Sequence, residues 1–357
     1  MATQEIDETK SEAFAGRMME VLNGGFLSLQ VSVGYQAGLF ETLAELPPSR
    51  SAQIAEAAGL NERYVREWLA GMTVGGIVEY DPNDETFRLP PEHAAFVTKA
   101  AGPNDMAFFT RYVGLCGLVE DDVLEAFRTG AGVPYEKYPD FQRIQGEESA
   151  RTYDATLIEG ILPLAKGLPE RLAAGIDVLD VGCGVGHALN LMAKAYPASR
   201  FVGYDFAEDG VAAGCAGAAA LGLENARFEA RNVHEFDEPE AYDLVTAFDV
   251  VHDLAHPSRV LEQVERALRP GGTFLMVEIA ASSRLENNIE NPLGPLLYGA
   301  SIFHCMSVSL AQGGEGHGTC WGEENATAAL EAARFVDIEA KRVEDDPFHA
   351  VFVAHKA

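Results

Sequence analysis

Apolar side chains recur three and four residues apart between Leu22 and Leu43, and this spacing predicts a helix with an apolar stripe. The stripe consists of Leu22, Phe26, Leu29, Val33, Ala37, Phe40 and Leu43. The opposite face of the predicted helix also lacks charge. We therefore expect this helix to be enclosed, either by a second copy of the chain, which we favour, or within the core of a single chain.

The following segments predict a helix, a tight turn, a second helix and a β-hairpin. Ser51–Ala58 is the first helix, with Ser51 as its N-cap, and Asn61 caps a second helix that ends at Gly75-Gly76. Val65, Trp68, Leu69 and Met72 share one face of that second helix. Ile77–Asp81 and Thr86–Pro90 flank a polar turn and form the hairpin. This order is typical of a winged helix, which we assign to an N-terminal domain of residues 1–100.

A winged helix suggests DNA binding, but the charge of this one opposes that function. Residues 1–100 contain seven Lys or Arg and fifteen Asp or Glu, and the whole chain has a formal net charge of -29. In the second helix, Arg63 and Arg66 are balanced by Glu62 and Glu67. Because a DNA-binding domain needs a basic surface, we expect no nucleic acid partner. Anionic membrane surfaces are disfavoured for the same reason.

Residues 101–174 predict a mostly helical connector, and residues 175–357 an α/β domain. Aromatic residues cluster in the connector, either as core residues or as one wall of a substrate pocket. The later part alternates strands and helices, which is typical of a doubly wound sheet. The expected strands are Val178–Val181, Arg200–Asp205, Ala226–Ala230, Tyr242–Phe248, Thr273–Ile279, Asp337–Val343 and Ala350–His355. Only residues 344–347 separate the last two, so we expect these two strands to be antiparallel.

The segment from Val178 to Gly186 reads as an apolar strand, a glycine turn and the start of a helix. Its pattern is D-x-G-x-G-x-G, with Asp180 near the strand end and His187 where a dinucleotide fingerprint requires its third glycine. Glycines let a ligand approach the backbone, and a helix N-terminus offers free N–H groups. Asp205 ends the second strand, where a carboxylate can accept hydrogen bonds from ribose hydroxyls.

Together, three motifs resemble class I S-adenosylmethionine-dependent methyltransferases (EC 2.1.1). They are the glycine turn, Gly203-Tyr204-Asp205, and Leu268-Arg269-Pro270-Gly271-Gly272 before the fifth strand. The antiparallel hairpin at the end is also typical of that family. Over the whole chain, the resemblance is to members with an N-terminal winged helix that mediates dimerisation. It implies a Rossmann-like sheet of seven strands, S-adenosylmethionine as cofactor with S-adenosylhomocysteine as product, and a homodimer.

The resemblance also implies roles for individual residues. Asp180, Gly182 and Gly184, with Cys183 between them, would contact the methionine part of the cofactor, and Asp205 its ribose, with Phe206 alongside. Asn232 and Val233 would line the adenine. Many family members have Asp where this chain has Asn232, but an amide offers both a donor and an acceptor to an adenine edge. The backbone at Phe248 would face the cofactor, and no metal is implied.

On the acceptor side, His252 is the first candidate for a catalytic base, and two further residues are alternatives. The chain reads Phe248-Asp249-Val250-Val251-His252-Asp253 after the fourth strand, which lacks the [DN]-P-P-[YF] motif of base-directed DNA methyltransferases. His252 lies past the ligand-facing edge of the sheet, where an imidazole of ordinary pKa can take a proton from a phenol or thiol. It either acts as this base or only shapes the pocket. Asp249 or Asp253 would orient its ring, and Glu278 and His304 are the next candidates.

Residues 281–323 form a long connection rich in apolar residues, with Gly313-Gly314-Glu315-Gly316 in its middle. This segment is either a hinged, lid-like cover over an uncharged, partly apolar acceptor, which we favour, or plain packing against the helical connector. Neither Asn291–Gly314 nor Val21–Phe40 has the continuous apolar run of a membrane span.

The leading function is therefore methyl transfer to an oxygen or thiol of a small molecule. The alternatives are a winged-helix regulator that senses S-adenosylmethionine and a scaffold that binds it without turnover. Residues 1–11 lack the features of a signal peptide, and the five cysteines contain no CxxC pair. We expect a reduced, cytoplasmic protein without a disulfide framework or zinc site.

Overall fold

A computed structural model describes residues 6–344 and 346–357, so the start of the N-terminal segment and Asp345 in the last turn lie outside the described residues. The chain divides into two compact units, one ending at Gly117 and the other spanning Leu118–Ala357. The first unit contains the predicted winged helix, and the second contains the predicted α/β domain.

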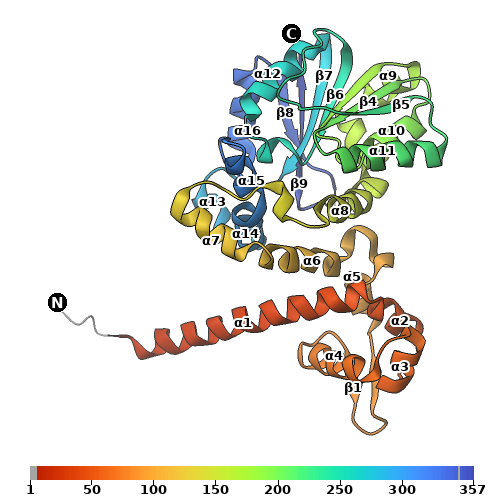
Figure 1. The fold of residues 1–357 in the computed structure, drawn as a ribbon, viewed down its shortest axis with the longest axis vertical. Helices are drawn as coiled ribbons and strands as arrows, with labels where there is room; N and C mark the ends of the chain where they lie inside the picture. Colours follow the sequence, from red (N-terminus) through yellow and green to blue (C-terminus); the bar gives the residue numbers. More distant parts are fainter. Residues whose placement is uncertain (1–5, 345) are drawn as a thin grey trace. The chain divides into compact units, whose positions relative to one another are not determined.

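The N-terminal unit consists of helices and one small hairpin. Its helices are α1 (Glu8–Gln36), α2 (Leu39–Glu45), α3 (Ser51–Ala58), α4 (Glu62–Val74), α5 (Pro91–Val97), a 3-10 segment (Lys99–Asn104) and α6 (Met106–Gly117) (Figure 1). The antiparallel strands β1 (Glu79–Asp81) and β2 (Thr86–Arg88) form the wing. This arrangement confirms the winged helix.

The apolar stripe does not lie on one continuous helix, as the sequence predicted. The chain breaks at Gly38, whose φ of 71° ends α1 and begins α2. Phe40 and Leu43 lie on α2 and are buried within the unit. On α1, however, Phe26 is 68% exposed and Val33 is 60% exposed. The core of this single chain therefore does not enclose the stripe along most of α1.

Caps and a buried face account for the helix-turn-helix. The Asn61 side chain accepts a hydrogen bond from Arg63 N–H, as expected of an N-cap. The N-cap of α3 is Arg50 rather than Ser51, and Arg50 N–H donates to the Gln53 side chain at 2.9 Å. The Ser51 hydroxyl donates instead to Glu62 Oε1 at 2.7 Å. The predicted apolar face of α4 is buried, and the Trp68 indole donates to Gln30 O of α1 at 2.8 Å.

The second unit is built on a mixed sheet with the order β5-β4-β3-β6-β7-β9-β8 among the described residues. Its strands are β3 (Asp177–Val181), β4 (Arg200–Asp205), β5 (Ala226–Ala230), β6 (Tyr242–Phe248), β7 (Leu268–Ile279), β8 (Val336–Lys341) and β9 (His349–His355). The strands from β5 to β7 are parallel, and β9 is antiparallel to both β7 and β8. This topology confirms the doubly wound sheet with an antiparallel end.

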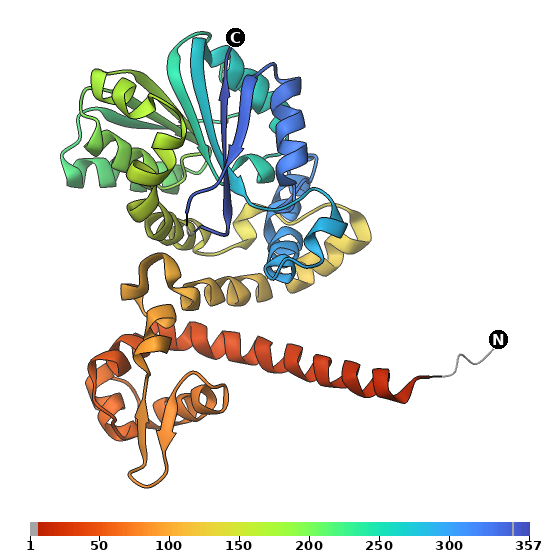
Figure 2. The same cartoon turned by 180° about the vertical axis from the view of Figure 1, so that it is seen from behind.

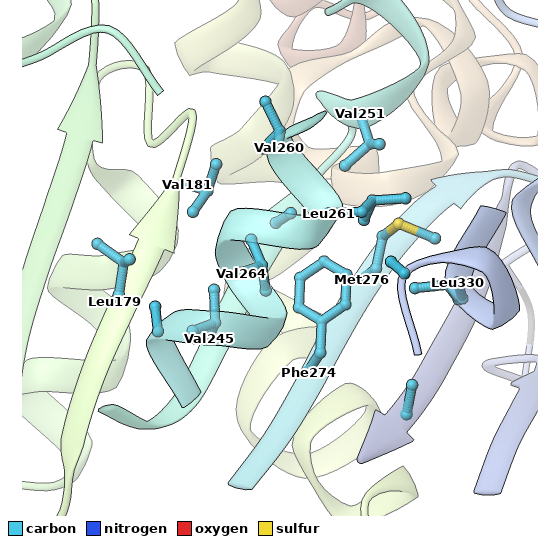
Figure 3. Close-up of a cluster of buried hydrophobic side chains, with 14 of the residues drawn as sticks. Leu179, Val181, Val245, Val251, Val260, Leu261, Val264, Phe274, Met276 and Leu330 are labelled. Carbon is cyan, nitrogen blue, oxygen red and sulfur yellow. The ribbon is translucent and has the colours of Figure 1, made fainter. Parts of the chain in front are cut away.

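Helices cover both faces of this sheet because alternate strand residues point to opposite sides. Leu179, Val245 and Phe274 face α12 (Pro257–Ala267) and α16 (Gly322–Ala332), as Figure 3 shows. Their neighbours Val178, Leu244 and Leu275 pack on the other side of the sheet. Figure 2 shows the ribbon from behind, with helices on both sides of the sheet. The helices preceding or following the first strands are α7 (Glu120–Thr129), α8 (Phe141–Thr156), α9 (Leu168–Ala174), α10 (His187–Ala195) and α11 (Glu208–Leu221). This packing fixes the strand ends that carry the candidate site.

The long connection 281–323 contains several short helices. They are α13 (Leu285–Asn288), α14 (Gly294–Ala300) and α15 (Met306–Ala311), with a π-helical turn (Ser301–Cys305) between the last two. Glu324 joins the two ends of the segment by accepting from the Ser282 hydroxyl at 2.6 Å and from Ser283 N–H at 2.7 Å. The segment packs on residues 132–141, where Val133 N–H donates to Ser307 O.

Gly294–Ala311 is the one described helical stretch whose length and composition would suffice to cross a membrane, and 39% of it is buried within the fold. Its buried polar residues include Ser307 and Ser309, and the Ser309 hydroxyl donates to Leu254 O at 2.9 Å. These contacts are those of a helix that packs against its own unit.

Candidate active site

The glycine turn joins β3 to α10 and has one open position. A Cβ on Gly182 would lie 2.4 Å from Val250 Cγ2, and one on Gly186 would lie 2.3 Å from Phe228. Packing within the protein therefore requires both of these glycines. A Cβ on Gly184 would have Gln142 Oε1 as its nearest neighbour, at 3.8 Å. Gly184 is thus the position of the turn that leaves space for a ligand.

Asp205, at the end of β4, stabilises the glycine turn from the neighbouring strand. One carboxylate oxygen accepts from Gly184 N–H at 2.8 Å, and the other accepts from Ala207 N–H at 2.8 Å. Burial raises the pKa of Asp205, and these two backbone donors oppose the rise. Each oxygen keeps a further lone pair, so the carboxylate can accept additional hydrogen bonds.

Asp180 is a buried carboxyl group that lacks a cationic partner among the described residues. The Thr246 hydroxyl donates to its Oδ1 at 2.7 Å. Burial raises the pKa of Asp180 to about 7, the Thr246 bond opposes this rise, and the charge of Asp205 adds to it. A ligand with a positive charge would stabilise the ionised form. The carboxyl groups beside the glycine turn therefore fit the positively charged sulfonium and ammonium groups of S-adenosylmethionine.

The other residues predicted to contact the cofactor lie at or near the same edge of the sheet. Phe206 is half exposed and contacts the Tyr135 ring edge-on, with ring centres 5.3 Å apart. Phe248 ends β6 against Tyr153, with ring centres 5.0 Å apart. Asn232 is exposed and Val233 buried just beyond β5. Burial raises the pKa of the Cys183 thiol well above its usual value, so this thiol is neutral in the turn.

His252 and Glu278 form one buried unit at the ends of β6 and β7. The His252 ring Nδ1 lies 2.7 Å from Glu278 Oε2, and the two side chains are 6% and 5% exposed. Glu278 Oε1 also accepts from the backbone N–H groups of Val251 and His252. The Cys305 thiol, from the π-helical turn, is a further hydrogen-bond partner of the His252 side chain. The sequence suggested Glu278 as an alternative base, whereas its contacts make it the partner that orients His252.

The basicity of His252 differs from the sequence expectation of an ordinary imidazole. Burial alone would lower its pKa, but the charge of the Glu278 carboxylate and the hydrogen bonds to Glu278 and Cys305 outweigh burial, and the pKa of His252 is raised well above its usual value. The contacts of His252 therefore favour its protonated form, and its capacity to accept a proton increases towards alkaline pH.

Neither Asp249 nor Asp253 orients His252, so that expectation was wrong. Asp253 instead accepts from the Tyr135 hydroxyl at 2.8 Å, and burial raises its pKa to about 6. Asp249, a non-glycine residue with a φ of 52°, accepts from the Tyr153 hydroxyl at 2.9 Å. The two aspartates instead connect β6 to the helical segment that precedes the α/β domain.

His349 and Asp346 are site residues that sequence reasoning missed. His349 Nε2 lies 3.2 Å from Asp249 Oδ2, and its Nδ1 lies 2.8 Å from Asp346 Oδ2. Burial would lower the pKa of His349, but the two carboxylates raise it well above its usual value. Asp346 and His349 lie three residues apart at the start of β9, and no local pattern shows that they face Asp249, about a hundred residues earlier.

His304 lies near His252 but in a different environment. Its ring stacks on Phe141 with centres 4.0 Å apart, and the rings of Tyr135 and Tyr138 meet it edge-on at 5.3 and 4.8 Å. Burial and the charge of His252 lower the pKa of His304 to about 3. His304 is thus neutral across the physiological range and lacks the basicity expected of a proton acceptor. The rings of Tyr135, Tyr138 and Phe141 thus surround His304 on one side.

No group of three or more potential metal ligands occurs among residues 6–344 and 346–357. The groups that gather at this edge are buried carboxyl groups, a carboxylate-bound imidazole and an aromatic wall. Such a site can hold a cation, orient an acceptor and transfer a proton.

Comparisons with known proteins identify both parts of the chain. Residues 25–99 match the Rv2258c-like winged HTH domain, and residues 172–345 match the Methyltransferase domain family. A probable S-adenosylmethionine-dependent methyltransferase of Mycolicibacterium smegmatis is 31% identical over 40% of this chain and 51% of its own length. Nocamycin O-methyltransferase of Saccharothrix syringae is 32% identical over 45% of this chain and 56% of its own length. The chain thus spans about half the length of these curated relatives.

Solved structures resemble the fold over nearly the whole chain. Human N-acetylserotonin methyltransferase, solved in complex with S-adenosylmethionine, has a TM-score of 0.69 at 18% identity and covers 100% of both chains. Mitomycin 7-O-methyltransferase has a TM-score of 0.73 at 17% identity and covers 98% of this chain and 100% of its own. The two domain families, their order along the chain and the topology of the sheet agree. The chain therefore combines an N-terminal domain of the Rv2258c-like winged HTH family with a C-terminal domain of the Methyltransferase domain family.

Proposed function

We propose that this protein transfers the methyl group of S-adenosylmethionine to an oxygen or thiol of a small, neutral and partly apolar acceptor. The observation that carries the proposal is the buried His252–Glu278 pair, which lies at the same strand edge as Asp180 and Asp205. A regulator that only senses the cofactor would not need a base at this edge. The ion pairs of Arg63 with Glu67 and of Arg66 with Glu62 also neutralise the helix that would read DNA.

In this proposal, the cofactor lies along the carboxyl edge from β3 to β6. Asp180 and the glycine turn bind its methionine part, Asp205 accepts from the ribose hydroxyls, and Asn232 and Val233 contact the base. Phe206 and Cys183 border this site, and the backbone at Phe248 faces the reacting centre. Bound there, the cofactor supplies an electrophilic methyl group with a good leaving group. The protein then has to exclude water, align the acceptor and remove its proton.

His252 removes that proton in the proposed reaction. An acceptor hydroxyl or thiol held beside the imidazole would give its proton to His252, and its oxygen or sulfur would then be free to take up the methyl group. Glu278 holds the ring through Nδ1 and stabilises the imidazolium that results. The His304 ring and its aromatic neighbours provide an apolar wall for the acceptor.

The acidity of the site supports a neutral acceptor. Burial raises the pKa values of Asp180, Asp205 and Asp253, which means that further negative charge is unfavourable there. A carboxylate or phosphate acceptor would add such charge. We therefore place phenols, alcohols and thiols before acidic acceptors.

The remaining parts of the proposal concern assembly and access. The exposed apolar residues of α1 support a homodimer, and the segment 281–323 would cover the acceptor. Five free cysteines fit a cytoplasmic location.

Labelled S-adenosylmethionine offered with a panel of phenols, alcohols and thiols tests the proposal directly. We expect His252→Ala to bind S-adenosylhomocysteine within a few-fold of wild type but to lose about 10²–10⁴ in kcat on any accepted substrate. His355→Ala serves as a control, because His355 lies at the opposite end of β9 and contacts Thr273. More than half of the wild-type kcat in His252→Ala would reject the base. S-adenosylhomocysteine binding without product from any acceptor would favour the sensor instead.

A further inference from the structure

Asn232, His234 and His256 form a polar array beside the predicted ribose contact. Ala230, the last residue of β5, pairs in register with Asp205, and Arg231 N–H donates to Asp205 O at 2.7 Å. Asn232 therefore lies at the ligand-facing edge, one strand away from Asp205. A base attached to a ribose held by Asp205 would extend towards this neighbouring strand end.

The hydrogen bonds of this array fix which atoms donate. The backbone N–H of His256 can only donate, and it lies 3.2 Å from His234 Nε2, which must therefore accept. Burial and the nearby His256 and Arg259 lower the pKa of His234, so its ring is neutral at pH 7. A neutral imidazole with an accepting Nε2 carries its proton on Nδ1. The Nδ1–H group then donates to Asn232 Oδ1 at 3.0 Å.

Asn232 Oδ1 receives a second hydrogen bond from the backbone N–H of His234, also at 3.0 Å. Both of its acceptor positions are thus used within the protein. The Asn232 side-chain NH2 group, in contrast, makes no hydrogen bond within the described ranges of the chain. The sequence suggested that this amide would offer a donor and an acceptor, whereas the structure leaves only the donor.

The array is held in place by a well-packed element. His256 is the N-cap of α12, whose Val260, Leu261 and Val264 are buried in the core of the second unit. The Gln263 side chain of the same helix donates to His234 O at 2.8 Å. Turning the Asn232 amide over would place two N–H groups of His234 against its NH2 group. The donor orientation is therefore the stable one.

We propose that Asn232 recognises the adenine base by donating to its ring nitrogen N1, not by accepting from the exocyclic amino group. This inference rests on the proposed cofactor site. The Watson–Crick edge of adenine presents an amino donor and the N1 acceptor, and a side chain with only donors available can satisfy N1 alone. An aspartate at this position would present only acceptors and would read the amino group. Asn232 thus donates a hydrogen bond to the base, whereas an aspartate at this position would accept one.

Calorimetric binding of S-adenosylhomocysteine and of its analogue with CH in place of N1 tests this inference. We expect wild type to bind the analogue about tenfold more weakly, the size of one lost hydrogen bond. In Asn232→Asp, the penalty for losing N1 should fall below about threefold, since a carboxylate cannot donate to it. Asn83→Asp, which adds the same charge on the exposed hairpin of the other unit, should retain the wild-type penalty.

Three outcomes would overturn the inference. Equal penalties in wild type and Asn232→Asp would mean that another group, such as a backbone N–H, binds N1. Equal affinity of wild type for S-adenosylhomocysteine and for the analogue would mean that no protein group binds N1. These two outcomes would leave the proposed function intact. Failure of wild type to bind S-adenosylhomocysteine at all would remove both the inference and the proposed function.

Discussion

At the scale of single residues, the contacts of His252 determine how the proposed reaction depends on pH. Glu278 and Cys305 raise its pKa, so the neutral, proton-accepting form becomes populated only as pH rises through that elevated value. Single-turnover rates should therefore increase towards alkaline pH. A flat profile between pH 6 and 9 would contradict this assignment.

Replacing Cys305 should shift that profile. Cys305→Ala removes a hydrogen bond that raises the pKa of His252, and it leaves the bond to Glu278 in place. We expect the alkaline rise in rate to move towards acid pH, with kcat at pH 7 equal to or above that of wild type. Cys116→Ala, in the N-terminal unit, is the matched control. An unchanged midpoint in Cys305→Ala would show that the thiol does not influence the base.

Asp180 should make cofactor binding pH-dependent. Its pKa of about 7 in the free protein means that half of the molecules carry it protonated near neutrality. A cationic ligand favours the ionised form, so binding releases a proton and affinity rises as pH increases from 6 to 8. Titration calorimetry in buffers of different ionisation enthalpy would measure this proton. Asp180→Asn should bind more weakly and without proton release, and equal proton release in both proteins would reject this role.

Local residue patterns could predict the cofactor edge but not the acceptor side. The glycine turn and its neighbours Asp180 and Asp205 lie at strand ends. A short local pattern of strand, turn and helix is therefore enough to place them at the edge of the sheet. His252 and Glu278 are 26 residues apart, and the register of two parallel strands brings them together. The wrong assignment of Asp249 and Asp253 had the same origin, because neighbours in sequence diverge at the end of a strand.

At the scale of elements, His349 joins β9 to β6 through a chain of buried polar groups. It contacts carboxylates of Asp249 and Asp346, and Asp249 also binds Tyr153 of α8. The raised pKa of His349 means that its stabilisation is complete below the unfolded pKa near 6.5 and is lost as pH rises through the folded value. The antiparallel end of the sheet should therefore weaken at alkaline pH.

Denaturant unfolding of His349→Ala measures this contribution. Removing the imidazole leaves two buried carboxylates without their cation, which typically costs about 3–5 kcal/mol. The deficit relative to wild type should be largest near pH 6 and smaller at high pH, where wild type loses the imidazolium as well. His317→Ala, which removes a more exposed histidine paired with Glu315, should cost less than about 1 kcal/mol. A pH-independent deficit in His349→Ala would show that packing alone is responsible.

The ends of helices could be predicted from the sequence where local capping residues determine them. They could not be predicted where contacts between distant segments determine them. Asn61 and Gly59 cap helices as expected. The regular apolar spacing did not reveal the break at Gly38, after which Phe40 packs edge-on against Trp68 of another helix. The helices within 281–323 were missed because prolines and glycines separate them into short pieces that gain stability from packing on residues 132–141.

At the scale of the whole molecule, the exposed side of α1 predicts self-association. Phe26, Leu29 and Val33 are each at least 44% exposed, and apolar clusters of this kind usually mark protein interfaces. We expect a homodimer in sedimentation at micromolar concentration, and monomers when Phe26 and Leu29 are both replaced by Asp. Tyr64→Asp with Val74→Asp adds the same charge at exposed positions of α4 and should remain dimeric. A monomeric wild type would refute the prediction.

The hydrogen bonds between Glu324 and the serines at the other end of the segment affect how freely residues 284–320 can change. Ser282 and Ser283 at one end of the segment and Glu324 at the other meet at a single clasp, where a Cβ on Gly322 would lie 2.1 Å from Ser283 N. A chain segment whose ends already meet can change in length or sequence at little entropic cost. If the segment covers the acceptor as proposed, changes within residues 284–320 would alter acceptor preference while the sheet and its cofactor edge stay unchanged.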